Sequence, residues 1–164
     1  MWRQMLIAAL ETQDALSLSV QPLQFKGRTG VLERGEASLS LRTASSETLM
    51  GSLFLPVAVR LGLSAEFDLR AVALGAACLE QNDCELVIRI SLPSLAQPDF
   101  LGRLREELSA QKWEHRLSLL CLELDAHGLT AYPDEVAEFC RAMALAGVGV
   151  GLRRLDQQPM GLTK

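Results

Sequence analysis

Two adjacent arginines, Arg153 and Arg154, follow the short apolar, glycine-rich run at residues 147–152. A run of this kind after a helix is typical of an inner strand of an α/β protein, and chemistry collects at the carboxyl end of such strands. Guanidinium groups suit a bidentate grip on phosphate, whereas a metal enzyme places carboxylates at such a position. The pattern therefore predicts a strand end that attracts anions and repels divalent cations.

A third arginine and a glutamate accompany them on two further apolar runs. Arg89 lies in the run at residues 85–92, and Glu123 lies in the run at residues 117–124. A glutamate in an apolar strand is more often a paired buried carboxylate than a lone ligand, and either Arg89 or Arg153 is a suitable partner. The residues leave two interpretations open, an internal salt-bridge cluster and a phosphate-binding site.

Helices and strands that alternate along the chain must position these residues. Helical spacing of apolar residues predicts helices at residues 2–12, 53–61, 66–80, 98–111 and 134–146. Short apolar runs predict strands at residues 85–92, 117–124 and 148–152, in the order of parallel βα units. Before them, alternation at Leu16, Leu18 and Val20 and again over residues 31–42 predicts an antiparallel strand pair with a turn at residues 27–30.

This order of elements indicates the α/β class and one domain over residues 1–164. About five strands are predicted, the first of them antiparallel, whereas a closed βα barrel has eight strands and about 250 residues. Either an open sheet is intended, or the chain is the N-terminal part of a TIM-like (βα) barrel whose remainder is absent. We favour the incomplete barrel, and we expect its unpaired edge to promote a homodimer, a swapped dimer or aggregates.

Composition restricts the class of protein further. With 49% hydrophobic and 22% charged residues, the chain is able to bury one sizeable core. A net charge of −4 gives no basic field, which argues against DNA as a partner, and the chain has no run of about 18 apolar residues that would span a membrane. Its four cysteines lie in apolar segments without metal-ligand spacing, so we expect reduced thiols and a cytoplasmic location.

Landmarks along residues 16–164 resemble, in order and at matching spacings, the EAL-type cyclic di-GMP phosphodiesterases. They are Gln21-Pro22, Ser38-Leu39-Ser40-Leu41-Arg42 where the family has Glu-Ala-Leu-Leu-Arg, Phe54-Leu55-Pro56-Val57-Ala58, Gly62-Leu63, Asp68, Ile88-Arg89-Ile90-Ser91 for Val-Asn-Leu-Ser, Leu122-Glu123-Leu124-Asp125-Ala126 for Leu-Glu-Ile-Thr-Glu, and residues 147–162 for the segment with Asp-Asp-Phe-Gly. The resemblance implies that the incomplete barrel is of the EAL type.

The same resemblance identifies the positions of the family's metal ligands, which here are Ser38, Arg89, Glu123, Arg153 and Arg154. Phosphodiester hydrolysis in the family needs hard oxygen ligands to hold divalent cations. Among these positions, Glu123 alone supplies an anionic oxygen, and a guanidinium does not lose its proton in a protein. We therefore expect a degenerate domain that is not an enzyme, with no catalytic residues, no bound metal and no other cofactor.

Four further positions match those that contact cyclic di-GMP in ligand-binding members: Gln21, Leu41, Arg42 and Asp68. Arginine suits phosphate, and carboxylate or amide groups suit the edge of guanine. The retained positions are similar to those of LapD-type receptors, inner-membrane proteins whose cytoplasmic EAL-like module binds the nucleotide without cleaving it. The resemblance thus implies a signalling receptor for cyclic di-GMP, with the second half of its site beyond Lys164.

A second interpretation is a regulatory domain that binds no nucleotide and docks other signalling domains or another protein partner. Ser38, Arg89, Val59 and Ala126 favour it, because each departs from the family pattern in the pocket. Arg42 also has an ordinary explanation, as a solvated charge at a strand end or as a partner for Glu36. The choice between receptor and docking domain stays open at the level of sequence.

Overall fold

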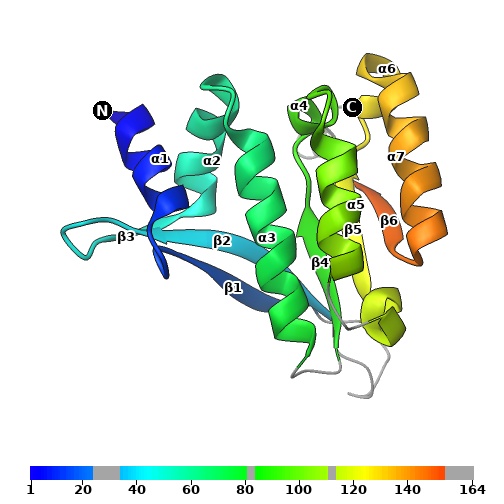
Figure 1. Ribbon diagram of the computed structural model, residues 1–164, viewed down its shortest axis with the longest axis horizontal. Helices are drawn as coiled ribbons and strands as arrows, with labels where there is room; N and C mark the ends of the chain where they lie inside the picture. The colour runs from blue at the N-terminus through cyan, green and yellow to red at the C-terminus, as the bar shows by residue number, and fades with distance from the viewer. Residues whose placement is uncertain (24–33, 81–83, 111–113, 154–164) are drawn as a thin grey trace, which may run out of the picture.

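The computed structural model describes residues 1–23, 34–80, 84–110 and 114–153 of the 164-residue chain. The strands are β1 (Leu16–Leu23), β2 (Arg34–Arg42), β3 (Thr48–Met50), β4 (Glu85–Arg89), β5 (Leu120–Asp125) and β6 (Gly149–Arg153). The helices are α1 (Trp2–Glu11), α2 (Gly51–Arg60), α3 (Ser64–Leu79), α4 (Leu92–Leu95), α5 (Phe100–Ala110), α6 (Gly128–Ala131) and α7 (Pro133–Ala146), with a 3-10 helix η1 (Glu114–Leu119). Figure 1 shows α3, α5 and α7 side by side in front of the strands.

One mixed sheet has the strand order β1-β2-β4-β5-β6, and β3 pairs with β2 beside this path. Strands β2, β4, β5 and β6 are parallel, whereas β1 and β3 run antiparallel to β2. Ala37, Ile88, Leu122 and Val150 are aligned across the four parallel strands. The carboxyl ends of these strands therefore meet at one edge of the sheet.

Alternation along the parallel strands separates an apolar face from a polar face. On β5, Leu120, Leu122 and Leu124 are fully buried in the core, whereas Glu123 between them is only partly buried. The helices cover the apolar face, with Phe54, Phe67, Phe100 and Phe139 among the largest buried side chains. Because successive side chains of a strand point to opposite faces, the polar residues of β2, β4, β5 and β6 share the other face.

The predicted α/β rhythm and the antiparallel first pair are confirmed, and the differences have local causes. The strand expected at residues 85–92 ends at Arg89, because Ser91 precedes the short helix α4 with Pro93 in its first turn. The strand expected at residues 117–124 begins at Leu120, after η1. The short β3 was not predicted, and with it the sheet has six strands within the described residues. The turn expected at residues 27–30 lies outside the described residues.

Gly147 shows how sequence determines one of these junctions. It follows α7 with φ of 84°, a left-handed conformation that glycine adopts without strain. The amides of Gly147 and Val148 donate to the carbonyls of Ala144 and Met143, and these bonds close the helix end. The chain then enters β6 directly, which places Arg153 at the carboxyl end of that strand.

None of the helices in the described ranges combines the length and the apolar character that crossing a bilayer requires.

Candidate ligand site at the carboxyl ends of the strands

Four charged residues from four neighbouring strands meet near the sheet edge that carries the carboxyl ends of β2, β4, β5 and β6. We call these residues, Glu36, Arg89, Glu123 and Arg153, the charge cluster. Glu36 Oε2 accepts hydrogen bonds from Nη2 of Arg89 at 3.2 Å and from Nη1 of Arg153 at 2.8 Å. Nη1 of Arg153 also lies 3.5 Å from Oε1 of Glu123. The internal salt-bridge cluster, one of the two interpretations of the sequence, is thus present, and Glu36 is its central acceptor.

Strand register explains why these side chains meet. Arg89 on β4 is directly opposite Glu123 on β5, and Glu123 is opposite Gly151 on β6. Arg153 comes two residues after Gly151 and therefore points to the same face. Exposed fractions of 46% for the Arg89 side chain and 33% for that of Arg153 show that water still reaches both guanidinium groups. The cluster is a partly solvated network whose two positive and two negative charges balance.

The donor set does not suit the divalent cations that the family resemblance implies. Ser38 offers a neutral hydroxyl, and Arg89 and Arg153 bring guanidinium groups close to the carboxylates. A metal cation next to Glu123 would be repelled by the guanidinium of Arg153, because Nη1 of Arg153 is already 3.5 Å from Oε1 of Glu123. Across the described ranges, no group of three or more His, Cys, Asp or Glu residues is arranged to hold a metal. Arg154 lies outside the described residues.

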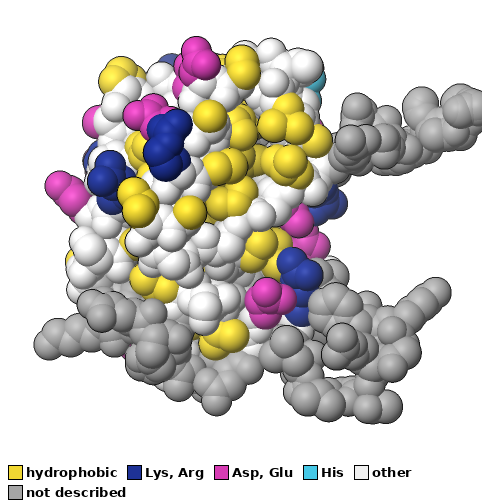
Figure 2. All heavy atoms as spheres, turned by 90° about the vertical axis from the view of Figure 1, so that its right-hand side faces the viewer, with side chains coloured by type: hydrophobic (Ala, Val, Ile, Leu, Met, Phe, Trp, Pro, Cys, Tyr) yellow, Lys and Arg dark blue, Asp and Glu magenta, His cyan; other side chains and the backbone are white. Residues whose placement is uncertain are grey.

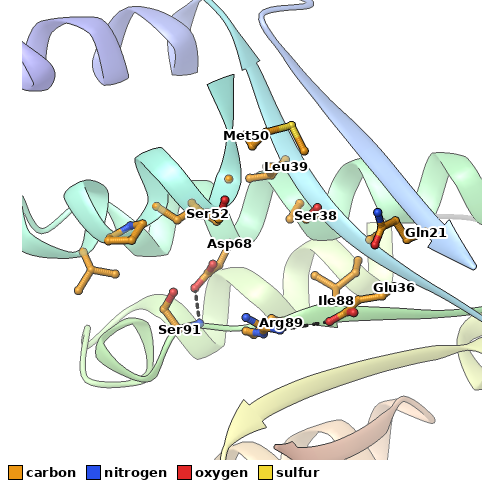
Figure 3. Close-up of a pocket in the computed structure, with 16 residues that line it drawn as sticks. Gln21, Glu36, Ser38, Leu39, Met50, Ser52, Asp68, Ile88, Arg89 and Ser91 are labelled. Carbon is orange, nitrogen blue, oxygen red and sulfur yellow. Dashed lines mark hydrogen bonds and ion pairs between the residues drawn. The ribbon is translucent and has the colours of Figure 1, made fainter. Parts of the chain in front are cut away.

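A pocket of about 570 Å³ opens beside the cluster, between β2, β4 and the helices α2 and α3. Its lining residues are Gln21, Glu36, Ala37, Ser38, Leu39, Met50, Gly51, Ser52, Leu55, Pro56, Val59, Asp68, Ala71, Ile88, Arg89 and Ser91. Figure 3 shows Gln21, Ser38 and Glu36 on the strands along one side, with Arg89 directed towards Glu36. Apolar walls with a few polar groups are typical of a small-molecule site.

Asp68 forms part of the pocket wall and fastens α3 to the turn after β4. Its Oδ2 accepts hydrogen bonds from the Ser91 amide at 2.9 Å and from the Ser94 hydroxyl at 2.6 Å. The Ser94 hydroxyl lies 3.0 Å from that of Ser64, which extends the network. Burial raises the pKa of Asp68 to about 7, although the hydrogen bonds from Ser94 and Ser91 act in the opposite direction. Asp68 has a clear positioning role at this junction.

The structure brings some of the predicted ligand-binding residues together and leaves others apart. Gln21 and Asp68 line the 570 Å³ pocket, beside Ser38 and Arg89 from the predicted metal-ligand positions. Arg42 instead lines a separate groove of about 830 Å³ beside α1, where its Nη2 lies 3.5 Å from the Asp14 carbonyl oxygen. The Leu41 side chain is 1% exposed and belongs to the core, although the residue also borders that groove.

Glu36 belongs to the site, although the sequence indicated it only as a partner for Arg42. A signal was available, since Glu36 and Ser38 are two positions apart on an alternating strand and must share a face. Ser91 was also missed as a pocket residue. Its amide becomes a donor to Asp68 because β4 ends early, which apolar periodicity did not indicate.

Solved structures of EAL-containing proteins are similar in fold to this chain. The structure is similar to Vibrio cholerae LapD S helix–GGDEF–EAL bound to cyclic di-GMP, with TM-score 0.81 and 22% identity over 99% of this chain and 39% of that chain. It is also similar to the FimX EAL domain from Pseudomonas aeruginosa bound to cyclic di-GMP, with TM-score 0.78 and 21% identity over 98% of this chain and 65% of that chain.

A third similar structure is the PaMucR phosphodiesterase in complex with cyclic di-GMP, with TM-score 0.70 and 20% identity over 84% of this chain and 59% of that chain. The chain spans less than two thirds of each of these three proteins. No curated protein matches it. The model of the EAL domain family matches residues 3–163, which is nearly the whole sequence, and the chain therefore belongs to the EAL domain family.

Proposed function

We propose that this EAL domain binds cyclic di-GMP and does not hydrolyse it. The charge cluster carries the proposal, since Arg89 and Arg153 occupy positions where the family resemblance implies metal ligands and both donate to Glu36. Metal-assisted hydrolysis requires cations that activate water and neutralise the charge developing on phosphate. A guanidinium can neutralise phosphate, but it cannot lower the pKa of a bound water as a divalent metal does. Binding without turnover is the consequence.

The pocket supports the nucleotide half of the proposal. Its volume of about 570 Å³ lies within the range of about 300–1,000 Å³ that is usual for small-molecule sites. The exposed amide of Gln21 suits the edge of guanine, and Arg89 suits a phosphate. Arg42 lies in a different groove, so we assign the phosphate contact at this pocket to Arg89. Asp68 supports the guanine side by holding the Ser91 backbone in place.

Two further parts of the proposal concern the cellular setting. The similar LapD structure contains an S helix and a GGDEF segment together with its EAL domain. We propose that this domain likewise works with other signalling domains, on the cytoplasmic side of the cell or as the cytoplasmic part of an inner-membrane receptor.

A docking domain that binds no nucleotide is the second candidate, and one observation favours it. Apolar side chains gather on the side of the molecule that carries α7 and β6, as Figure 2 shows. Leu145 is 82% exposed and Leu152 is 48% exposed, although both are large aliphatic residues. Exposed apolar groups of this kind are typical of protein contacts.

Hydrolysis is tested by incubating the protein with cyclic di-GMP and either magnesium or manganese, and by separating the nucleotides by chromatography. We expect no linear dinucleotide above the level of a control without protein. The linear dinucleotide offered as substrate should also remain intact. Product that increases with protein concentration would refute the non-catalytic part of the proposal. If the protein fails to bind cyclic di-GMP in a titration, the docking domain becomes the better candidate.

A further inference from the structure

The two arginines of the charge cluster share a single carboxylate oxygen. Arg89 and Arg153 both donate to Oε2 of Glu36, at 3.2 and 2.8 Å. All three side chains retain exposed fractions between 31% and 46%, so none is locked into the interior. Ion pairs with this much solvent exposure are individually weak. An oxyanion ligand can therefore compete with the carboxylate for the two arginines.

The position of Arg89 gives a ligand access to this pair. Arg89 lines the 570 Å³ pocket together with Glu36, Ser38 and Gln21. It also lines an adjoining hollow of about 230 Å³, where Arg153 and Asp125 lie. The guanidinium of Arg89 thus borders both spaces, and a group that enters the pocket along β2 reaches Glu36 and Arg89 together.

We propose that Glu36 is an internal competitor for phosphate. Its carboxylate occupies the place on Arg89 and Arg153 that a phosphate of cyclic di-GMP takes, so the nucleotide binds fully only when Glu36 releases the arginines. This inference rests on the proposed function of the pocket and adds a regulatory element to it. A phosphodiester offers two non-bridging oxygens, one for each guanidinium, where Glu36 offers one shared oxygen.

Glu123 has a different role from Glu36 in this exchange. Its side chain is 20% exposed, and its Oε1 is buried 3.5 Å from Nη1 of Arg153 without a hydrogen-bond partner in the described structure. Glu123 therefore stays next to Arg153 and keeps the guanidinium of Arg153 near the strand ends when Glu36 withdraws. Glu36 is the carboxylate that lines the pocket itself, which makes it the group that a ligand meets.

The test is calorimetric titration of cyclic di-GMP into the wild-type protein and the variant Glu36→Gln. Glutamine keeps the length of the side chain and removes its charge, so we expect binding on the order of tenfold tighter. The matched control is Glu85→Gln, which removes the same charge from the carboxylate 3.3 Å from Arg34 on the same strands. Glu85 does not line either space beside Arg89, and we expect its variant to bind like the wild type.

A further variant, Arg89→Gln, verifies that the gain acts through the arginine. Added to Glu36→Gln, it should remove most of the tighter binding. Thermal melting of each variant verifies that it is folded at the temperature of titration.

The outcomes separate this inference from the function on which it rests. Binding that is tighter in Glu36→Gln than in the wild type, with no such gain in Glu85→Gln, supports the inference. Wild-type binding that Glu36→Gln leaves unchanged or weakens overturns the inference and leaves the function intact. Equal gains in Glu36→Gln and Glu85→Gln also overturn it, because net charge then explains the effect. No binding by either the wild type or Glu36→Gln refutes both.

Discussion

Glu36 and Ser38 lie two positions apart on β2, and this spacing changes the chemistry of the strand ends. Ser38 stands where the family resemblance implies a metal-binding glutamate. Glu36 places its carboxylate on the same face of β2, two residues before Ser38. There it meets Arg89 and Arg153 instead of a metal ion. A carboxylate in the right region is therefore not enough for a metal site, because its neighbours decide which positive charge it meets.

Aspartates at positions 153 and 154 should not by themselves give the protein catalytic activity. We expect the double variant Arg153→Asp with Arg154→Asp to show no hydrolysis of cyclic di-GMP in magnesium or manganese. Ser38 and Arg89 remain at two other ligand positions, and Arg89 still provides a guanidinium 3.2 Å from Glu36. A chromatographic assay against the wild type is the measurement, and measurable turnover by the double variant would show that the metal-ligand positions are wrongly assigned.

Asp68 should make stability depend on pH. Burial disfavours the charged form and raises the pKa of Asp68 from its ordinary value of 3.8 to about 7 in the folded protein. Between these values the folded state holds the proton more tightly, so this contribution to stability is complete below pH 4 and is lost as the pH rises through 7. From pH 5 to pH 8 the loss in the free energy of unfolding is on the order of 2 kcal/mol.

Urea denaturation of the wild type and of Asp68→Asn across this pH range measures the effect. The asparagine variant should lack the decline, because it has no proton to lose. Glu66 does not obscure the comparison, since its hydrogen bond to Arg103 lowers the pKa of Glu66 and its contribution is lost only below about pH 4.5. Parallel pH profiles for the two proteins would mean that Asp68 is ionised in the folded state at all these pH values.

At the scale of elements, the contact between α2 and β2 depends on a glycine. A Cβ atom on Gly51 would lie 2.9 Å from the backbone oxygen of Leu39, which cannot move aside as a flexible side chain would. Gly51 begins α2 and also lines the 570 Å³ pocket. The spacing between helix and strand, and with it the width of the pocket, thus depends on the absence of a side chain here.

We expect Gly51→Ala to destabilise the protein by about 1–3 kcal/mol, because the backbone must shift to remove the overlap. Gly102→Ala is the matched control, since nothing lies within 4 Å of a Cβ at that exposed position of α5. Alanine should stabilise the helix there by about 0.5–1 kcal/mol. Chemical denaturation compares the two, and similar stability changes for both variants would contradict the described packing of α2.

Most elements could be predicted from the sequence because their signals are local. Apolar alternation identified β1 and β2 as an antiparallel pair, and helical spacing identified α3 and α7 within two residues at each end. The three-residue β3 has no such signal, because pairing with β2 alone defines it. The site was harder, since Glu36 and Arg153 are distant in sequence and only the strand register brings them together. Arg42 lies beyond the part of β2 that pairs with β4 and is aligned with Thr48 of β3, a register that was not visible in the sequence.

At the scale of the whole molecule, β6 is an edge of the sheet formed by the described strands. Among the described strands it pairs with β5 on one side only. Leu152 on β6 is 48% exposed, and Leu145 at the end of α7 is 82% exposed. Figure 2 shows apolar side chains gathered on this side of the molecule. Edge strands with exposed apolar residues invite pairing with another chain.

We expect the protein to form dimers or larger species as its concentration rises, and Leu152→Lys to reduce this association. Lysine on an edge strand opposes pairing because its charge would be buried in the contact. Leu53→Lys is the control, since Leu53 is 53% exposed on α2, away from β6. Light scattering measures the mass of each protein. A stable wild-type monomer at high concentration would show that the β6 edge does not drive association.

The protein should bind cyclic di-GMP by means of its own cations, and calorimetric titration of the wild-type protein in two buffers tests this most directly. One buffer contains EDTA and the other contains magnesium. Because Arg89 and Arg153 stand at family metal positions, we expect one-site binding with the same affinity in both buffers. Binding that requires magnesium, or the absence of binding heat in both buffers, would contradict the claim.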